Sequence, residues 1–466
     1  MSAAAPASAA SKRAVALLSL AVGIVLADSA IVTLALPSIL RQFGSEVGEV
    51  AWVLISFNLA LALAAVPAAR VCLRGDPAVS GALGLVVFAA ASAGCALAPS
   101  LTALLVARVV QALGGALVIM ACLELLVFAT GSERMGARRW AAAGVAGAAV
   151  GPVMGGLLTS AVSWQSIFIV QVPLVAMALP AALALRGKAA RSRPERGAAT
   201  DRPHLAANLA LALLSAALTA ALFLLVLLLV EGWRRSPALA AVTVTVIPLA
   251  ALAAGPLARA ARAGTRAEAV AGALLMSGGL AALALLPDAN PLWTVAPQAL
   301  VGLGLGLTVD SLTAAALRDR VPRALHGGWT IAARHAGVVA GLVILTPIFT
   351  ADLRSAQAPA QEAITAQVLD SDLAAGSKLS LAEGLGKRLE AEDGRVPDLG
   401  PAFRTAKLPA GQAGSAARLE TDLDDQLERA ATRAFRDAFL VAAALALLAM
   451  VPALMLREAR GTERSA

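Results

Sequence analysis

The sequence predicts an all-α membrane protein with twelve transmembrane helices, and three observations support this: its composition, its apolar blocks and the placement of its basic residues. Of the 466 residues, 59% are hydrophobic and only 15% are charged, whereas soluble domains carry roughly one-quarter charged residues. The apolar residues lie in blocks of about 20, the length that crosses a hydrocarbon core about 30 Å thick. Because the blocks are continuous and rich in Ala and Leu, we expect helices rather than the alternating strands of a barrel.

Charged or Pro/Gly-rich breaks delimit the twelve blocks. They span residues 14–40, 50–69, 79–98, 101–128, 140–161, 165–185, 205–230, 237–258, 268–286, 291–316, 327–350 and 435–456. Two longer polar segments divide the series, and the first of them is expected to be a flexible linker. The expected domains are a first six-helix bundle (14–185), a cytoplasmic linker (186–204), helices 7–11 of a second bundle (205–350), an insertion (351–434) and helix 12 of the second bundle (435–456).

Arginine and lysine gather in every second connection between the blocks. Short basic loops resist translocation, so we place these connections and both termini in the cytoplasm, on the inner side of a cell membrane. The net charge of +8 then reflects cytoplasmic loops rather than a nucleic-acid partner, and the Arg- and Ala-rich composition indicates a bacterial source. The basic connections hold Arg70 and Arg74; Arg134, Arg138 and Arg139; Arg186, Lys188, Arg191, Arg193, Arg196 and Arg202; Arg259, Arg262 and Arg266; and Arg318, Arg320 and Arg323.

Residues 351–434 are polar and, by this topology, extracytoplasmic. Stretches such as 379–392 and 416–435 have helical apolar spacing, with Leu419, Leu423 and Leu427 at steps of four. We predict a small helical insertion between helices 11 and 12, and the alternative is a disordered loop.

The first block contains Asp-Ser-Ala-Ile-Val-Thr-Leu-Ala-Leu-Pro at residues 28–37. This resembles the first-helix signature of the major facilitator superfamily, in particular its fourteen-span drug:proton antiporters, which read Leu-Asp-x-Thr-Ile-Val-Asn-Val-Ala-Leu-Pro. A carboxylate within a span costs about 3 kcal/mol and normally faces a cavity or a partner. Burial favours its protonated form, as an exchange of protons for substrate requires. The alternative is that Asp28 reaches the outer interface or caps a neighbouring helix.

The fourth block holds Arg-Val-Val-Gln-Ala-Leu-Gly-Gly at residues 108–115, similar to the family motif Arg-x-x-Gln-Gly-x-Gly. A guanidinium inside an apolar helix stays charged, so Arg108 must meet a carboxylate, carbonyl groups or water. The resemblance implies a part in proton transfer for Arg108, and the alternative is simple bonding to carbonyls of a neighbouring helix. Gln111 of the same motif is a candidate for the substrate cavity.

The fifth block is the most diagnostic, because residues 144–156 resemble the antiporter motif Gly-x-x-x-Gly-Pro-x-x-Gly-Gly, which the family carries mainly in exporters. Glycines four apart let helices approach closely, and the proline removes a backbone hydrogen bond. We expect a hinge or a barrier to proton leak here, and ordinary small-residue packing is the alternative. The motif residues are Gly147, Gly151, Pro152, Gly155 and Gly156.

Other candidate residues carry less specific signals. The family's loop motif after the second span is degenerate, because Arg74 stands at its acidic position and only Asp76 is available as a substitute. Asp310 lies about mid-depth in the tenth block and is a second candidate for a proton or cation site. Arg334 and His335, early in the eleventh block, are candidates for a counter-ion and a titrating group.

The resemblance implies a major-facilitator fold that works by alternating access. We expect a monomeric, proton-coupled efflux carrier for small amphiphilic or drug-like compounds, with Asp28, Arg108 and Asp310 in proton coupling. The alternative is an exporter of a lipid or cell-envelope component that uses residues 351–434 to engage an extracytoplasmic protein partner. We expect no enzyme, metal site or cofactor, since the histidines are scattered, and the proton gradient is the expected source of energy.

Overall fold

The computed structural model describes residues 9–191, 202–261, 263–318, 320–391, 398–406 and 409–456. Within these ranges, twelve helical segments are long and apolar enough to cross a membrane. This confirms the predicted number of spans and the all-α fold class. Residues 192–201, which make up half of the predicted linker 186–204, lie outside the described residues.

The first six spans are single helices except the sixth, which consists of α6 followed by α7. The short α8 comes after them. The helices are α1 (Ala9–Phe43), α2 (Val47–Arg74), α3 (Pro77–Ala96), α4 (Leu101–Thr130), α5 (Glu133–Ala161), α6 (Ser166–Ala176), α7 (Leu179–Leu183) and α8 (Lys188–Arg191).

The second six spans contain more local distortions. A π-helix, η1 (Leu228–Gly232), ends the seventh span, and a 3-10 helix, η2 (Pro291–Thr294), begins the tenth. The twelfth span lies in a series of three consecutive helices, α17 to α19. The α-helices of these spans are α9 (Leu205–Leu227), α10 (Pro237–Val244), α11 (Val246–Ala261), α12 (Thr265–Leu283), α13 (Val295–Leu317), α14 (Arg323–Asp370), α17 (Ala413–Ala434), α18 (Arg436–Leu448) and α19 (Met450–Leu454).

Capping residues set where several spans begin and end. The Asp76 side chain accepts a hydrogen bond from the backbone N–H of Ala78 at 2.9 Å and begins α3. Ser100 and Ser132 cap α4 and α5 in the same way. Gly131 has φ +63°, a left-handed conformation that glycine adopts without strain, and so lets the chain turn between α4 and α5.

His204 begins α9 with an unusual cap, in which its Nδ1 accepts a hydrogen bond from the backbone N–H of Ala207 at 3.2 Å. Burial lowers the pKa of His204, and the positive charge of Arg320 lowers the pKa further. The ring is thereby favoured as the neutral acceptor that the cap requires.

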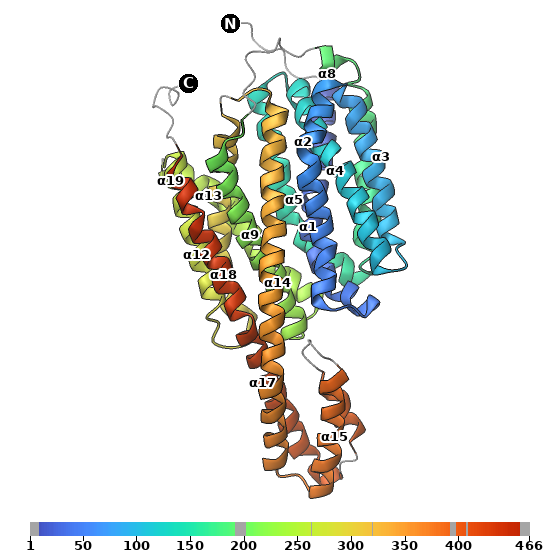
Figure 1. Cartoon of the computed structure of the whole chain (residues 1–466). Coiled ribbons are helices and arrows are strands. Elements are labelled where there is room, and N and C mark those ends of the chain that lie inside the picture. The colour runs from blue at the N-terminus through green and yellow to red at the C-terminus, as the bar shows by residue number, and fades with distance from the viewer. Residues whose placement is uncertain are drawn as a thin grey trace.

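The spans form two bundles that meet along two seams. In the first bundle α1 packs on α5, and α4 packs on α2 and α3; in the second, α9 packs on α14, and α13 packs on α11 and α12. The seams between the bundles are α2 against α14 and α5 against α10. Figure 1 shows α8 and the last helix, α19, toward one end of the molecule, here called the terminus-bearing end, and α15 and α17 at the opposite, insertion-bearing end.

The described residues between 351 and 434 form a helical unit that projects beyond the bundles (Figure 1). The sequence prediction ended span eleven at residue 350, but α14 continues without a break to Asp370, so no linker separates the span from the insertion. The unit is completed by α15 (Ala375–Ala391), α16 (Gly400–Thr405), η3 (Ala410–Gln412) and α17. It has an apolar core of its own, formed by Ile364, Val368, Leu373, Leu381, Leu385, Leu399, Ala402, Phe403, Ala416, Leu419, Leu423 and Leu427.

The returning arm of this unit is fixed to the second bundle. The indole N–H of Trp233 donates to Thr432 Oγ1 at 2.9 Å, and Arg234 Nη1 lies 2.9 Å from Asp424 Oδ1. The outgoing arm is α14 itself. Both arms of the insertion are therefore tied to the second bundle.

The apolar core of the insertion can be tested with two leucines. Leu423 is fully buried, whereas Leu379 on α15 is 73% exposed. We expect Leu423→Ala to lower the local stability of the insertion by about 2–5 kcal/mol, because it removes buried methyl groups and leaves a cavity. Leu379→Ala is the matched control and should change little. Hydrogen exchange over residues 351–434 of the purified full-length protein measures the difference, and equal exchange in both variants would contradict a packed core.

Candidate transport site

A buried ion pair lies inside the first bundle. Asp28 on α1 and Arg108 on α4 are both fully buried, and Arg108 Nη1 lies 2.5 Å from Asp28 Oδ2. An unpaired charge at this depth would be strongly destabilising. The contact brings together two of the residues proposed for proton coupling and excludes the alternative that Asp28 serves only as a helix-end residue at the interface.

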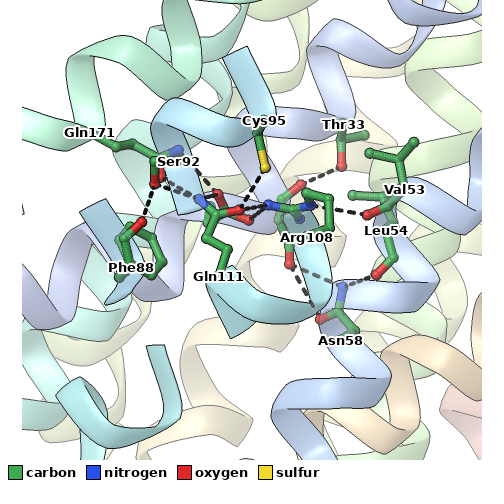
Figure 2. A network of polar contacts seen from close by, with 12 residues as sticks. Thr33, Val53, Leu54, Asn58, Phe88, Ser92, Cys95, Arg108, Gln111 and Gln171 are labelled. Carbon is green, nitrogen blue, oxygen red and sulfur yellow. Dashed lines mark hydrogen bonds and ion pairs between the residues drawn. The ribbon is translucent and has the colours of Figure 1, made fainter. Parts of the chain in front are cut away.

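Two glutamines complete the pair (Figure 2). Gln111 Oε1 accepts a hydrogen bond from Arg108 Nη1 at 2.7 Å, and Gln111 Nε2 lies 3.3 Å from Asp28 Oδ1. Gln171 on α6 donates from Nε2 to Asp28 Oδ1 at 3.1 Å, and the hydroxyl of Ser92 on α3 accepts from Gln111 Nε2 at 2.9 Å. Helices α1, α3, α4 and α6 thus share one polar centre.

The rest of the Arg108 guanidinium is packed rather than solvated. Its Nε donates to the carbonyl of Val53 on α2 at 3.1 Å, and its Cζ lies 4.1 Å from the centre of the Phe57 ring. Within the described residues, Nη2 of Arg108 has no hydrogen-bond partner. The N–H donors of this one nitrogen are therefore left without a partner in an otherwise filled site.

A cavity of about 160 Å³ lies between the two bundles. Helices α1, α2 and α5 line it on one side, and α9, α11, α13 and α14 line it on the other. Its wall is largely apolar, as is typical of sites for small organic molecules. The polar and charged lining residues are Ser29, Thr33, Asn58, Ser215, Thr219, Asp310, Arg334 and His335.

A hydrogen-bonded bridge connects the two bundles at this cavity. His335 Nδ1 on α14 lies 2.7 Å from Asn58 Oδ1 on α2, and Asn58 Nδ2 donates to the Ser29 hydroxyl at 3.1 Å. Ser29 directly follows Asp28 in the chain. Asp28 and Arg108 themselves do not line the cavity but lie behind its wall.

The remaining candidates face the cavity from the second bundle. Asp310 on α13 also lines a second pocket, next to Arg259 at the end of α11, so it faces both the central cavity and the terminus-bearing end. Arg334 lies on the cavity wall next to His335. Gln111 belongs to the buried network and not to the cavity wall, contrary to its expected place in the cavity.

The antiporter-motif glycines hold α5 against α1. A Cβ at Gly147 would lie 2.1 Å from the carbonyl oxygen of Gly23, and a Cβ at Gly155 would lie 2.3 Å from that of Ile31. Gly151 faces α1 between them, whereas Gly156 faces Ala241 of α10 in the other bundle, and Pro152 lines the cavity. The motif therefore combines close packing within a bundle with contact across the interface.

The second bundle repeats this packing at a place that the sequence reading did not single out. Cβ atoms at Gly337 and Gly341 on α14 would lie 2.0 Å and 2.6 Å from the carbonyl oxygens of Ala212 and Ala216 on α9. The signal was a Gly-x-x-x-Gly pair in the eleventh block. In each half, glycines thus let the helix that contacts the other half pack closely on its neighbour: α5 on α1 in the first half, and α14 on α9 in the second.

Several network residues were also missed. Asn58, Ser92 and Gln171 are polar side chains within apolar blocks, and that was the available signal. Asp76, considered as a substitute in the degenerate loop motif, instead caps α3 and accepts a hydrogen bond from the Gly187 backbone N–H at 2.6 Å. Both contacts lie within the first half of the chain, so neither joins the two bundles.

Two helical bundles around a central cavity are the architecture of secondary transporters. The chain belongs to the Major Facilitator Superfamily, whose family model matches residues 18–345. This confirms the resemblance carried by the motifs.

Relatives in the family include drug-efflux and resistance proteins. Drug efflux pump JefA of Mycobacterium tuberculosis is 35% identical over 161 residues, which are 34% of this chain and 32% of that protein. The tetracenomycin C resistance and export protein of Streptomyces glaucescens is 35% identical over 173 residues, 36% of this chain and 32% of that protein. The methylenomycin A resistance protein of Streptomyces coelicolor is 34% identical over 240 residues, 50% and 48% of the two chains. The matches thus span from about a third to a half of these relatives.

Among solved structures, a bacterial homologue of the human lysosomal transporter Spinster, in an inward-facing and unoccupied conformation, is similar with a TM-score of 0.58. The comparison covers 97% of this chain and 99% of that chain at 17% sequence identity. At this identity the likeness concerns the fold alone.

The close approach of α1 and α5 can be tested with matched glycine substitutions. Gly147→Ala would force α1 to shift, so we expect it to lower the stability of the purified protein by about 1–3 kcal/mol. Gly278 on α12 has no heavy atom within 4 Å of an added Cβ, so Gly278→Ala should be neutral or stabilising by up to about 1 kcal/mol. Thermal unfolding in detergent compares the two variants. If Gly147→Ala unfolded at the same temperature as Gly278→Ala, α1 and α5 would not be in close contact.

Proposed function

We propose that this transporter is a proton-coupled efflux carrier for small amphiphilic or drug-like compounds and that it works by alternating access. The observation that carries the proposal is the cavity between the bundles, whose wall at Ser29 adjoins the buried pair of Asp28 and Arg108. Substrate can occupy the cavity while a proton is exchanged at Asp28, the residue next to Ser29 of the cavity wall. Coupling needs this proximity of the two sites.

Asp28 and Arg108 are the proposed coupling pair. Arg108 bonds Oδ2 of the Asp28 carboxylate, and Gln111 and Gln171 bond Oδ1. Protonation of the carboxylate would remove its negative charge, weaken the ion pair with Arg108 and so favour a rearrangement of these contacts. A rearrangement moves α1 relative to α4, and α1 also carries Ser29 on the cavity wall. Proton uptake and cavity shape are thereby linked through one helix.

Asp310 is the proposed second proton site. In the described part of the chain, no hydrogen bond or ion pair occupies its carboxylate. Because it lines both the central cavity and the pocket near Arg259, it can exchange protons with the terminus-bearing end without breaking a polar contact.

Alternating access requires contacts between the bundles to separate at each end in turn. At the insertion-bearing end, Arg41 Nη1 lies 2.7 Å from Glu231 Oε1. At the terminus-bearing end, Arg323 on α14 lies 3.1 Å from Glu133 on α5. All four side chains are at least partly exposed, and such pairs contribute only about 0–1 kcal/mol. They can therefore separate at small cost.

The proposed direction of transport is outward, and it is supported by the proposed orientation and by the relatives. Basic residues such as Arg74, Arg134 and Arg323 lie in the terminal turns of helices at the terminus-bearing end. We place that end in the cytoplasm of a bacterial cell, with the insertion outside. Efflux is supported by the relatives named as efflux and resistance proteins and by the antiporter motif on α5.

A second candidate function is export of a lipid or cell-envelope component with an extracytoplasmic protein partner. The observation that favours it is the helical insertion, which has its own core and is continuous with span eleven. Loosening that core with Leu423→Ala should reduce partner-dependent lipid export while leaving efflux of soluble drug-like compounds intact.

The proton-coupling role of Asp28 is tested by Asp28→Asn, which keeps the size of the side chain but cannot exchange a proton near neutral pH. We expect substrate-driven proton release from proteoliposomes to fall to the level of protein-free liposomes, across a panel of lipophilic cations, organic anions and neutral amphiphiles. Asp288→Asn, at an exposed carboxylate in the connection between α12 and η2, is the matched control. Proton release by Asp28→Asn equal to that of the wild type would remove Asp28 from coupling.

A further inference from the structure

Arg334 places a positive charge on the wall of the central cavity. It lies eleven residues after the start of α14 at Arg323, which is about 16 Å along the helix axis and so about half the depth of a hydrocarbon core about 30 Å thick. Within the described residues, no ion pair or hydrogen bond involves the Arg334 side chain. An arginine in this position retains its charge, because its side chain does not deprotonate in proteins.

The neighbouring polar groups do not neutralise this charge. His335 is bonded to Asn58, which is bonded in turn to Ser29. The Asp28 carboxylate is taken by Arg108 behind the cavity wall. The cavity thus presents a cation that no residue in the described part of the chain satisfies.

Asp310, the acidic residue on the wall, lies elsewhere. It is seven residues before the end of α13, about 10 Å from the terminus-bearing end, whereas Arg334 is deeper. The two form no ion pair. The wall around Arg334 is otherwise apolar or weakly polar, with Leu218, Thr219 and Val338 among its residues.

We propose that the central cavity binds small amphiphilic organic monoanions, with the carboxylate or an equivalent anionic group on Arg334 and the apolar body against α9 and α14. The inference rests on the proposed function in taking this cavity as the substrate site. A guanidinium matches a carboxylate with two parallel hydrogen bonds. In a site with little water such a pair is stronger than it is at the surface.

The size of the cavity indicates the size of a suitable probe. An engineered protein cavity of about 150 Å³ holds benzene, and this cavity is about 160 Å³. A benzene ring that carries one anionic group and a short apolar substituent therefore matches the site. The probe 4-ethylbenzoate has this form. Its amide, 4-ethylbenzamide, is a neutral analogue of the same shape, and 4-ethylbenzylammonium carries the opposite charge.

Binding is measured by ligand-observed NMR titration of the full-length protein in lipid nanodiscs. We expect 4-ethylbenzoate to bind the wild type more tightly than either analogue. Arg334→Gln should weaken 4-ethylbenzoate by about 10- to 100-fold, the loss typical of a charged hydrogen-bonded pair, and leave the amide unchanged. Arg334→Lys keeps the charge without the two-pronged geometry and should fall between the two. Arg318→Gln, at the end of α13 outside the cavity, is the matched control.

Three outcomes would overturn the inference: tighter binding of the cation, equal binding of all three probes, or an Arg334→Gln protein that keeps full affinity for 4-ethylbenzoate. Gel filtration and melting of each variant exclude misfolding, and the Arg334→Lys variant keeps the test valid if Arg334→Gln does not fold. Proton release is measured separately. Anion binding that depends on Arg334, without substrate-driven proton release, would contradict the proposed function and leave the anion site standing. Proton release driven by cations only would support proton-coupled transport and contradict the anion site.

Discussion

A charge inside an apolar bundle must be paired, and the first bundle of this protein is organised around one such pair. Asp28 and Arg108 come from helices α1 and α4 and are both fully buried. Breaking a buried pair costs about 3–5 kcal/mol, because the remaining charge is left uncompensated. Gln111 and Gln171 extend the same centre to α3 and α6. Four helices of one bundle are therefore held in register by polar groups within an apolar core.

Helix α1 links the buried ion pair to the cavity and to the interface between the bundles. It holds Asp28 in the buried network and Ser29 on the cavity wall, and its backbone is covered by Gly147 and Gly155 of α5. Because α5 also contacts α10 of the other bundle, a shift of α1 affects both the cavity and the interface. The bridge from Ser29 through Asn58 to α14 adds a second route across. The proposed coupling between a proton and a substrate requires a shared element of this kind.

The sequence predicted the spans well, because hydrophobicity alone decides which segments enter lipid. It also identified Asp28 and Arg108 one at a time, as charges stranded in apolar blocks. Their contact joins residues 80 positions apart and depends on the rotation of two helices, which no local pattern records. Asn58 and Gln171 were missed because uncharged amides stand out less in an apolar run. The continuation of α14 to Asp370 could not be predicted, because a drop in hydrophobicity at residue 350 says where an apolar block ends and not where its helix ends.

Asp28 and Arg108 are expected to stabilise the folded protein as a pair. A double-mutant cycle measures this directly, with the unfolding free energies of Asp28→Asn, Arg108→Gln and the double variant in a common detergent. We predict that each single substitution is destabilising, Arg108→Gln by about 3–5 kcal/mol because it leaves the Asp28 carboxylate unpaired, and that the double variant loses clearly less than the sum of the two. Losses that simply add would contradict this pairing, since they would show that the two side chains do not interact in the folded protein.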